Sequence, residues 1–544
     1  MDSRRRLLLR TSCAAIVAAT LLVSGCSSGG SDTEDQGEKS ASPDKSQGQG
    51  QGREAIGDAG AKPLEPLPRA VPEELKPYYE QKLSWRSCGV QGFECATMRA
   101  PLDYDKPDSG KDLKLAVARK KASGSGEKTG SLMVNPGGPG GSAIEYVQQA
   151  AGIGYPAQVR DRYDIVGMDP RGVARSEPVK CLDDKRMDRY TQVDQTPDDQ
   201  KEKDALVKAY KDFAASCEKE SGDILGHVST VEAARDMDVL RGVLGDKKLH
   251  YVGASYGTFL GATYAGLYPQ NSGRLVLDGA MDPSLSMLRV NRDQTGGFET
   301  AFQAFAKDCV RKSGCPLGSG SVEDASKRMS ALFEKLDAKP ARTGESRKLT
   351  ESLATTGVIR AMYDEGSWPR LRDALKQAVK GDGAQLLGLA DEYYERDPDG
   401  SYGNIMFANP AVNCLDLPAA FSGPEDVEKA VPDFEKASPV FGRGFAWAAL
   451  NCGYWKQQPT GEPHRITAEG ADPILVVGTT RDPATPYAWS QGLAAQLSPA
   501  HLLTYDGDGH TAYLRGGQCV DDKVNTYLLT GKAPSDGTKC GAGE

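Results

Sequence analysis

Six short apolar runs mark this chain, and each ends at or beside a glycine, proline, aspartate or asparagine: residues 131–135, 163–169, 249–254, 274–278, 473–478 and 501–505. Runs of this length without strict alternation of apolar and polar positions indicate strands that are buried on both faces of a parallel sheet. Residues 113–119 do alternate, which predicts a half-exposed edge strand. Segments with apolar positions on one helical face, such as 230–244, lie between the runs. The alternation of strands and helices predicts an α/β fold with a mostly parallel sheet flanked by helices.

A long segment without such runs divides the strand pattern into two parts. Residues 285–468 are rich in helix-forming stretches, for example 298–312 and 322–336, and contain few segments that resemble strands. We predict that they form a helical cap above the carboxyl edge of the sheet, inserted between core residues 76–284 and 469–544. An independent downstream domain is the alternative. The two apolar runs that follow the insertion argue against it, because they supply further strands to the sheet.

The first residues have the pattern of an export signal. A run of three arginines at residues 4–6 precedes an apolar stretch, residues 14–23, that is too short for a lasting membrane span. The stretch ends in Val-Ser-Gly before Cys26 and resembles a bacterial lipoprotein signal. The resemblance implies removal of residues 1–25, a lipid on the Cys26 sulfur, and a location on the outer face of the cell membrane with release as an option. A plain secretory signal is the alternative, and the Ser-Arg-Arg start is a weaker match to a twin-arginine export signal.

The next stretch has the composition of a tether. Residues 27 to about 70 are mainly Ser, Gly, Gln, Pro and charged residues, with almost no large apolar side chain. Such a segment cannot bury enough surface to offset the entropy of ordering, so we predict a disordered tether over residues 26–75. The formal charge of the chain is −9, and residues 1–25 hold four arginines and one aspartate, so the remainder carries −9 − 3 = −12. An acidic body argues against nucleic acid as a partner, because phosphate binding needs a basic surface.

The cysteines indicate disulfides. Of twelve cysteines, Cys13 would leave with the signal and Cys26 would be lipidated, so an even number, ten, remains in an exported protein. Sequence alone does not determine connectivity, but the spacing favours pairs between neighbours along the chain: Cys88–Cys95, Cys181–Cys217, Cys309–Cys315, Cys414–Cys452 and Cys519–Cys540. Zinc is disfavoured, because the chain has no Cys-x-x-Cys motif and its histidines do not cluster with the cysteines. We expect neither a metal nor an organic cofactor.

The segment around Ser255 is typical of a nucleophile elbow, in which a strand passes through a sharp turn into a helix. An apolar run ends in Gly-Ala-Ser-Tyr-Gly at residues 253–257, and small residues follow at helical spacing. The turn strains the backbone of the serine and is tolerated where the residues two before and two after have no side chain. Gly253 and Gly257 meet this requirement. A glycine-rich turn in an ordinary strand–helix connection is the alternative.

Two further polar side chains follow apolar runs, as Ser255 does. Asp482 comes after the run 473–478, and His510 comes after the run 501–505. Ligands of an open α/β sheet bind beyond the carboxyl ends of its strands, and serine, acid, histidine is the chain order of a triad built on such a sheet. Ser255 would attack, His510 would take its proton, and Asp482 would hold the imidazole and stabilise its charge. Asp506 and Asp508 are rival acids, and a surface-loop role is the alternative for His510.

A glycine-rich sequence, Asn-Pro-Gly-Gly-Pro-Gly-Gly-Ser at residues 135–142, directly follows the first apolar run. Its glycines let backbone N–H groups approach a reacting oxygen closely, as an oxyanion hole requires. We assign one donor to the N–H group of Gly138 and the other to that of Tyr256. A phosphate-binding loop is the alternative, but no Gly-Lys-Ser/Thr sequence follows.

These motifs together resemble a known family. The Pro-Gly-Gly-Pro-Gly-Gly sequence resembles the His-Gly-Gly-Pro-Gly loop of proline iminopeptidases, with Pro136 in place of the histidine. The sequences at 135–142, 169–172, 253–257, 277–279 and 482–486 resemble those of the secreted tripeptidyl aminopeptidases of actinobacteria. The resemblance covers residues 85–285 and 410–530 and implies an α/β-hydrolase fold with a cap. It implies a serine exopeptidase that releases short peptides, tripeptides in that family, from free N-termini, with Ser255, Asp482 and His510 as its triad.

The substrate side is less determined by the sequence. An aminopeptidase must bind an α-ammonium group and needs a carboxylate to pair with it. We predict Asp416, whose loop a Cys414–Cys452 disulfide would stiffen, and then Glu145, which closely follows the glycine-rich loop. A solvated surface acid is the alternative role for both. A carboxylesterase or lipase would use the same triad, and a catalytically inactive binding lipoprotein is a third hypothesis. The sequence has no signal for oligomeric state.

Overall fold

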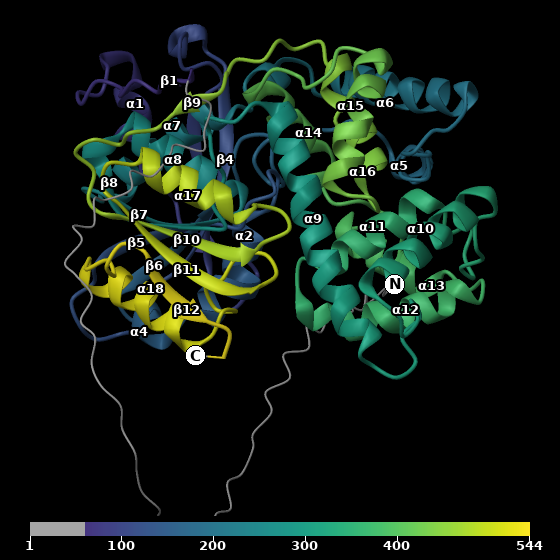
Figure 1. Ribbon diagram of the computed structural model, residues 1–544. Helices are drawn as coiled ribbons and strands as arrows, with labels where there is room; N and C mark the ends of the chain where they lie inside the picture. Colours follow the sequence, from purple (N-terminus) through teal and green to yellow (C-terminus); the bar gives the residue numbers. More distant parts are fainter. Residues whose placement is uncertain (1–59, 544) are drawn as a thin grey trace, which may run out of the picture. The chain divides into compact units, whose positions relative to one another are not determined.

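The computed structural model describes residues 60–543, and its central feature is a sheet of ten strands (Figure 1). The strand order is β12-β11-β10-β8-β7-β5-β6-β4-β3-β2. Neighbours from β12 to β6 are parallel, whereas β4, β3 and β2 continue the sheet in antiparallel pairs. The bounds are Arg86–Ser87 for β2, Glu94–Pro101 for β3, Asp112–Lys120 for β4, Gly130–Asn135 for β5, Tyr163–Met168 for β6, Leu249–Ala254 for β7, Ser272–Asp278 for β8, Ile474–Arg481 for β10, Ala500–Asp508 for β11 and Thr538–Gly541 for β12.

The six apolar runs all form strands of this sheet, in β5, β6, β7, β8, β10 and β11, as predicted. Their side chains feed two cores, one on each face. In β8, Leu275 and Leu277 pack in the core of one face, whereas Val276 between them packs in the core of the other. The predicted edge position of residues 113–119 is wrong, because β4 lies between β3 and β6. Strands β3 and β2, which follow β4 toward the edge of the sheet, were not predicted from the sequence.

Helices cover both faces of the sheet (Figure 1). Helices α7 (Thr230–Leu244), α8 (Tyr256–Leu267) and α17 (Tyr487–Gln496) contribute to the core of one face, and α4 (Ala157–Arg160) and α18 (Gln518–Thr530) to that of the other. Helix α7 has the bounds predicted from its periodicity. The Ser229 side chain accepts the N–H of Glu232 at its start, and Gly245 at its end has a φ of 80°. The short helices α1, α2 and α3 span Lys76–Tyr79, Ala143–Tyr146 and Gly152–Gly154.

Between β8 and β10 the chain is almost entirely helical, and β10 then returns beside β8. The helices are α9 (Met287–Val310), α10 (Val322–Ala338), α11 (Glu351–Met362), α12 (Trp368–Val379), α13 (Ala384–Tyr393), α14 (Ile405–Asp416), α15 (Pro424–Ala437) and α16 (Gly442–Ala448). Phenylalanines and leucines of α9 to α13 form a hydrophobic core of their own. We call this helical region the cap.

The cap has a second source that the sequence analysis assigned to the core. Helices α5 (Asp184–Tyr190) and α6 (Gln200–Ser221) lie between β6 and α7 in the chain. Leu206 and Tyr210 of α6 pack with Phe434 and Trp447 from α15 and α16, and Figure 1 shows α6 beside α15. The predicted core part 76–284 therefore contains an excursion into the cap, because the apolar face of α6 finds its partners there.

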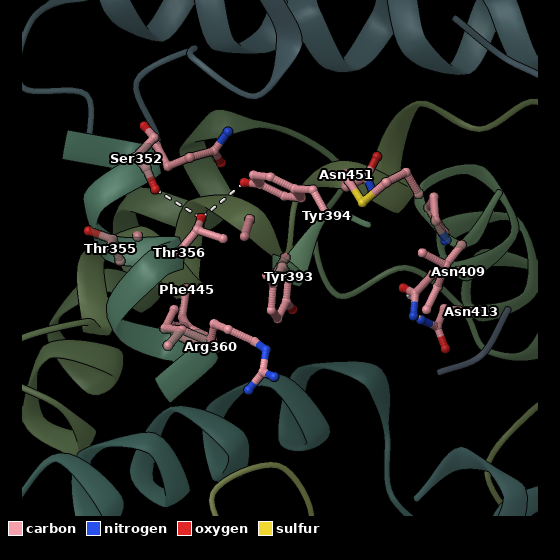
Figure 2. Close-up of a pocket in the computed structure, with 18 of the residues that line it drawn as sticks. Ser352, Thr355, Thr356, Arg360, Tyr393, Tyr394, Asn409, Asn413, Phe445 and Asn451 are labelled. Carbon is pink, nitrogen blue, oxygen red and sulfur yellow. Dashed lines mark hydrogen bonds between the residues drawn. The ribbon is translucent and has the colours of Figure 1, made fainter. Parts of the chain in front are cut away.

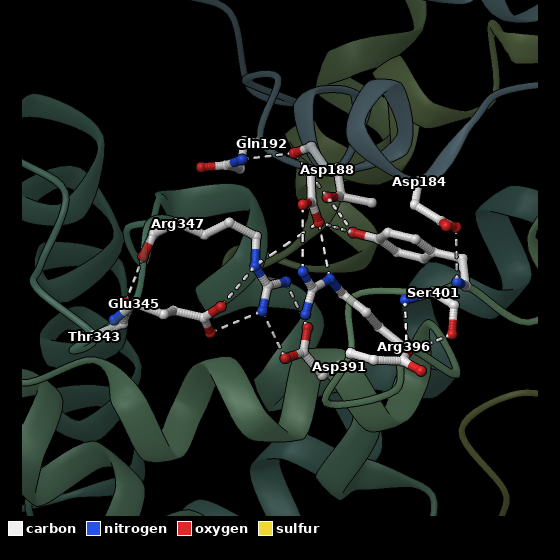
Figure 3. A network of polar contacts seen from close by, with 12 residues as sticks. Asp184, Asp188, Gln192, Thr343, Glu345, Arg347, Asp391, Arg396 and Ser401 are labelled. Carbon is white, nitrogen blue, oxygen red and sulfur yellow. Dashed lines mark hydrogen bonds and ion pairs between the residues drawn. The ribbon is translucent and has the colours of Figure 1, made fainter. Parts of the chain in front are cut away.

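Ion pairs join this excursion to the main cap (Figure 3). The Arg347 side chain is 3% exposed and contacts Asp391 at 2.6 Å and Glu345 at 2.9 Å. Asp188 of α5 lies 3.8 Å from Arg347 and 2.8 Å from Arg396. Two arginines thus hold carboxylates from sequence-distant segments together.

The predicted tether, residues 26–75, is wrong in its last part. Strand β1 (Lys62–Pro63) pairs in parallel with β9 (His464–Arg465), and Leu64 and Leu67 pack against the core. Backbone hydrogen bonds and leucine burial order this segment. The predicted signal, Cys26 and the rest of the tether lie outside the described residues. Among residues 60–543, no helix is long and apolar enough to cross a membrane.

The ten cysteines expected to pair form five disulfides, and these are the pairs predicted from the spacing: Cys88–Cys95, Cys181–Cys217, Cys309–Cys315, Cys414–Cys452 and Cys519–Cys540.

Candidate active site

Ser255 stands at the turn between β7 and α8, with a φ of 57° and a ψ of −126°. This is a strained conformation for a residue with a side chain. A Cβ atom on Gly253 would lie 2.3 Å from the carbonyl oxygen of Gly257, and one on Gly257 would lie 2.8 Å from that of Asn135. The space around the turn therefore requires both glycines, for the reason expected from the sequence.

Asp482 and His510 meet beyond the ends of β10 and β11. The His510 Nδ1 atom lies 2.8 Å and 2.9 Å from the two carboxylate oxygens of Asp482. The backbone N–H groups of Ala484 and Thr485 donate to Asp482 Oδ1, and that of Thr511 donates to Oδ2. Asp482 is 2% exposed, so these donors replace the water that a buried carboxylate loses. The buried Asp482 carboxylate thus has backbone donors in place of water and accepts the imidazole as well.

The other imidazole nitrogen faces the same space as the serine. His510 Nε2 is buried and has no hydrogen-bond partner within residues 60–543. His510 and Ser255 both line one cavity. Nucleophile–base hydrogen bonds are often formed only when substrate is bound, so this arrangement leaves Nε2 free to take the serine proton.

The rival acids lie elsewhere. Asp506 and Asp508 both accept hydrogen bonds from the Arg481 side chain, and Asp506 also accepts one from the Thr480 hydroxyl. Neither is paired with His510. Asp482 is the carboxylate that the fold brings to the imidazole.

A further carboxylate, Asp278 at the end of β8, holds the histidine loop and was missed as a site residue. It accepts the backbone N–H groups of Ala512 and Tyr513, and its own carbonyl oxygen accepts the Ser255 N–H. Burial raises the pKa of Asp278 to about 6. The sequence signal for it was its position at a strand end, which it shares with Asp482.

The glycine-rich loop lies against the elbow. The side-chain oxygen of Asn135 accepts the Gly137 N–H at 2.8 Å. Gly137 and Gly138 have φ angles of 95° and 116°, and a Cβ on Gly137 would lie 2.5 Å from the Ala254 carbonyl oxygen and 3.1 Å from the Tyr256 nitrogen. Gly138 lines the cavity with Ser255. Gly138 thus lines the same cavity as Ser255, and Tyr256 follows the serine directly, whereas their role as oxyanion donors stays a prediction.

The cavity that contains these groups has a volume of about 770 Å³, and most of its lining residues belong to the cap (Figure 2). Its polar wall includes Asn409, Asn413 and Asn451, and the Thr356 hydroxyl lies 3.0 Å from the Tyr394 hydroxyl. Its aromatic lining comes from Tyr190, Tyr210, Phe213, Tyr363, Tyr393, Tyr394, Phe441 and Phe445. A large apolar cavity with a few placed polar groups is typical of a ligand site.

Neither residue predicted to bind the substrate amine lines this cavity. Asp416 is 8% exposed, and its carboxylate accepts the backbone N–H and the hydroxyl of Thr230. Burial raises its pKa to about 7. Glu145 is exposed and lies 3.0 Å from Arg175. Both predictions are wrong for the same reason, namely that each carboxylate already has its partner outside the cavity.

Three glutamates that the sequence analysis did not single out do line the cavity: Glu351, Glu392 and Glu395. Glu392 is paired with Arg370 and Arg360. Glu351 and Glu395 form no ion pair with the described residues 60–543. Burial raises the pKa of Glu351 to about 7, and burial, with Glu145 and Asp397 nearby, raises that of Glu395. No motif marked these residues, because they lie in cap helices and loops brought together by packing.

Comparison with known proteins relates nearly the whole chain to hydrolases. It is 38% identical over 489 residues to the serine protease Hip1 of Mycobacterium tuberculosis, which covers 86% of this chain and 92% of that protein. It is 38% identical over 478 residues to carboxylesterase B of the same organism, covering 85% and 91%. It is 30% identical over 480 residues to the tripeptidyl aminopeptidase of Streptomyces lividans, covering 84% and 86%.

A family model described as TAP-like protein matches residues 438–540. Among solved structures, proline iminopeptidase of Mycobacterium smegmatis is similar over 79% of this chain and 97% of that chain, with 16% identity and a TM-score of 0.33. The fold is established by the sheet order, the elbow and the cap described above. The chain belongs to the α/β-hydrolase family of serine peptidases that includes Hip1 and the tripeptidyl aminopeptidases.

Proposed function

We propose that this protein is an exported serine aminopeptidase that releases short peptides, tripeptides among them, from the free N-termini of peptide substrates. The observation that carries the proposal is the strained Ser255 facing a cap-covered cavity beside the His510–Asp482 pair. A cavity lined largely by the cap suits an enzyme that accepts the end of a chain, because such walls restrict the length of substrate that can bind.

The reaction is acyl transfer in two steps. His510 Nε2 takes the Ser255 proton as Oγ bonds to the scissile carbonyl carbon, and the N–H groups of Gly138 and Tyr256 stabilise the resulting oxyanion. The C–N bond then breaks as His510 donates the proton to the leaving amine. In the second step His510 takes a proton from the water that attacks the acyl carbon. It then donates this proton to Ser255 Oγ as the peptide is released. Asp482 stabilises the imidazolium in both steps.

The cavity walls support a peptide with a free amine. Within residues 60–543 no cation pairs with Glu351 or Glu395, and an α-ammonium group would pair with either carboxylate. Helix α11 runs from Glu351 to Met362, and Tyr363 after it contacts His510. At a rise of about 1.5 Å per residue this helix separates Glu351 from the histidine by roughly 18 Å. That length corresponds to about five extended residues, at about 3.3–3.6 Å each, so a tripeptide fits within it.

A mass-spectrometric time course on a mixed peptide library tests the activity. We expect di- or tripeptides to appear from free N-termini, Ser255→Ala to abolish their release, and N-acetylated peptides to resist cleavage. Glu351→Gln and Glu395→Gln, compared with Glu428→Gln on the surface of α15, locate the amine site through a raised KM on free-amine substrates. Loss of single residues, or cleavage from the C-terminus, would overturn the proposal.

A carboxylesterase is the second candidate, favoured by the 38% identity to a protein of that name and by the aromatic cavity wall. Hydrolysis of a p-nitrophenyl ester without hydrolysis of any free-amine peptide p-nitroanilide would select it. Fluorophosphonate labelling that disappears in Ser255→Ala would exclude an inactive binding protein under either candidate.

We propose further that the protein acts on the outer face of the cell membrane, held by a lipid on Cys26. The signal pattern before Cys26 and the five disulfides support this location, because disulfides persist in oxidising compartments. Metabolic labelling with palmitate should mark the wild type and spare Cys26→Ser, which should appear in the medium. Labelling of Cys26→Ser would contradict the assignment.

A further inference from the structure

The cap contacts the main chain of His510 directly. Tyr363, which follows α11, accepts the His510 N–H at its carbonyl oxygen, at 2.9 Å. The two rings meet edge to face, with centroids 5.5 Å apart and planes at 82°. Tyr363 also lines the cavity. The same cap residue therefore touches the histidine and faces the space where substrate would bind.

A second contact secures the loop on both sides of the histidine. Arg515 Nη2 donates to the carbonyl oxygens of Asp508 and Thr511, at 2.8 Å and 2.6 Å. Arg515 Nη1 donates to Glu365 Oε2 at 2.9 Å. Glu365 belongs to the cap. The guanidinium group therefore links the cap to the carbonyl groups of Asp508 and Thr511, which lie before and after His510 in the loop.

The packing at this contact is close. Gly509 has a φ of 87°, and a Cβ atom there would lie 2.7 Å from Arg515 Nη1 and 3.0 Å from Glu365 Oε2. On its other side the loop is held by the core, through Asp482 to Thr511 and through Asp278 to Ala512. The core therefore holds the N–H groups of Thr511 and Ala512, whereas the cap accepts the His510 N–H and, through the Glu365–Arg515 pair, supports the carbonyl groups of Asp508 and Thr511.

We propose that Tyr363 and the Glu365–Arg515 pair are positioning residues for His510, so that the cap sets the orientation of the catalytic base as well as enclosing the substrate. The inference rests on the role of His510 in the proposed function. It predicts that loosening the contact lowers the rate of proton transfer from Ser255 while leaving substrate affinity unchanged. A misplacement of about 1 Å at a catalytic group reduces rates by up to about 10².

A purely structural role would have a different signature. The Glu365 and Arg515 side chains are 42% and 22% exposed, and an ion pair with that exposure contributes little to folding stability. The pair can therefore be broken without unfolding the protein. Glu428, 48% exposed and paired with Lys203, is the matched control, because it is a cap glutamate of similar exposure that contacts neither His510 nor the cavity.

The experiment compares Glu365→Gln, Glu365→Ala and Arg515→Lys with Glu428→Gln in the full-length protein. The measurements are kcat and KM on a free-amine peptide p-nitroanilide, the rate of fluorophosphonate labelling of Ser255, and the thermal melting temperature. We expect the first three variants to lower kcat and the labelling rate by roughly tenfold, with KM and melting temperature within error of the wild type. Glu365→Asp should recover part of the loss, and Glu428→Gln should behave as the wild type.

Wild-type kcat and labelling rates in Glu365→Gln and Glu365→Ala would overturn the inference, as would a loss confined to KM. A loss that follows the melting temperature would assign the pair a structural role and overturn it as well. Activity that survives in Ser255→Ala would instead reject the proposed function, so the two failures are distinguishable.

Discussion

Replacement of Asp482 by asparagine tests how the acid acts on His510. The backbone N–H groups of Ala484 and Thr485 both donate to Oδ1, so the asparagine oxygen takes that place and its NH₂ group takes the place of Oδ2. There it faces the Thr511 N–H and the imidazole Nδ1, both of which the carboxylate accepts in the wild type. The exchange turns an acceptor into a donor and favours the imidazole with its proton on Nε2.

That tautomer cannot take the Ser255 proton. The change of tautomer, with the loss of the charge that stabilises the imidazolium, lowers kcat by about 10⁴ in a serine triad. At about 1.36 kcal/mol per tenfold, this corresponds to roughly 5 kcal/mol of transition-state stabilisation. The buried Thr511 N–H also loses its acceptor, which costs about 1–3 kcal/mol of folding stability. The variant should therefore be folded, less stable and nearly inactive.

The assay is kcat/KM on a free-amine peptide p-nitroanilide, with urea unfolding in parallel. Asp506→Asn is the matched control, because Asp506 is an exposed carboxylate near the same strand ends and contacts Arg481 and Thr480. It should retain wild-type activity. A folded Asp482→Asn variant with more than about a tenth of wild-type activity would refute the reasoning, as would an equal loss in the control.

Three further outcomes follow from the packing. Asp416→Asn should remain active. Burial raises the Asp416 pKa from 3.8 to about 7, so this carboxyl lowers the folding stability of the wild type by up to about 4 kcal/mol as pH rises from 4 to 7. In urea unfolding, the free energy of unfolding of the variant relative to that of the wild type should therefore be higher at pH 8 than at pH 5. A difference in free energy of unfolding between the two proteins that is the same at both pH values would contradict this. Arg347→Met should lower the free energy of unfolding by about 3–5 kcal/mol, since it removes the cation that pairs with Asp391 and Glu345 in the cap, and an unchanged urea midpoint would argue otherwise. Gly253→Ala should abolish fluorophosphonate labelling, because its Cβ would lie 2.3 Å from the Gly257 oxygen; normal labelling would show that the elbow relaxes.

The parallel strands were predictable because burial on both faces leaves a continuous apolar run in the sequence. Strands β2 and β3 were not found, since β2 has two residues and β3 has a mixed burial pattern at the antiparallel end of the sheet. The end of the tether was misplaced for a similar reason. Its leucines are few, and β1 pairs with β9, which lies about 400 residues further along the chain.

The candidate catalytic residues could be predicted because each follows a strand, and the carboxyl ends of parallel strands lie at one edge of the sheet. Ser255, Asp482 and His510 required knowledge of strand ends and local turn geometry only. The five disulfides were accessible because each joins cysteines that are neighbours in the sequence.

The tertiary structure alone decided which carboxylates face the substrate cavity. Asp416 was a reasonable candidate until helix α14 placed it against Thr230, 186 residues away in the chain, where burial and two hydrogen bonds occupy it. Glu351 and Glu395 face the cavity through the packing of cap helices, which no local pattern encodes. The same packing brings Tyr363 and Glu365 to the His510 loop. Strand ends are determined by local periodicity, whereas the walls of the cavity are determined by contacts between segments that are distant in the chain.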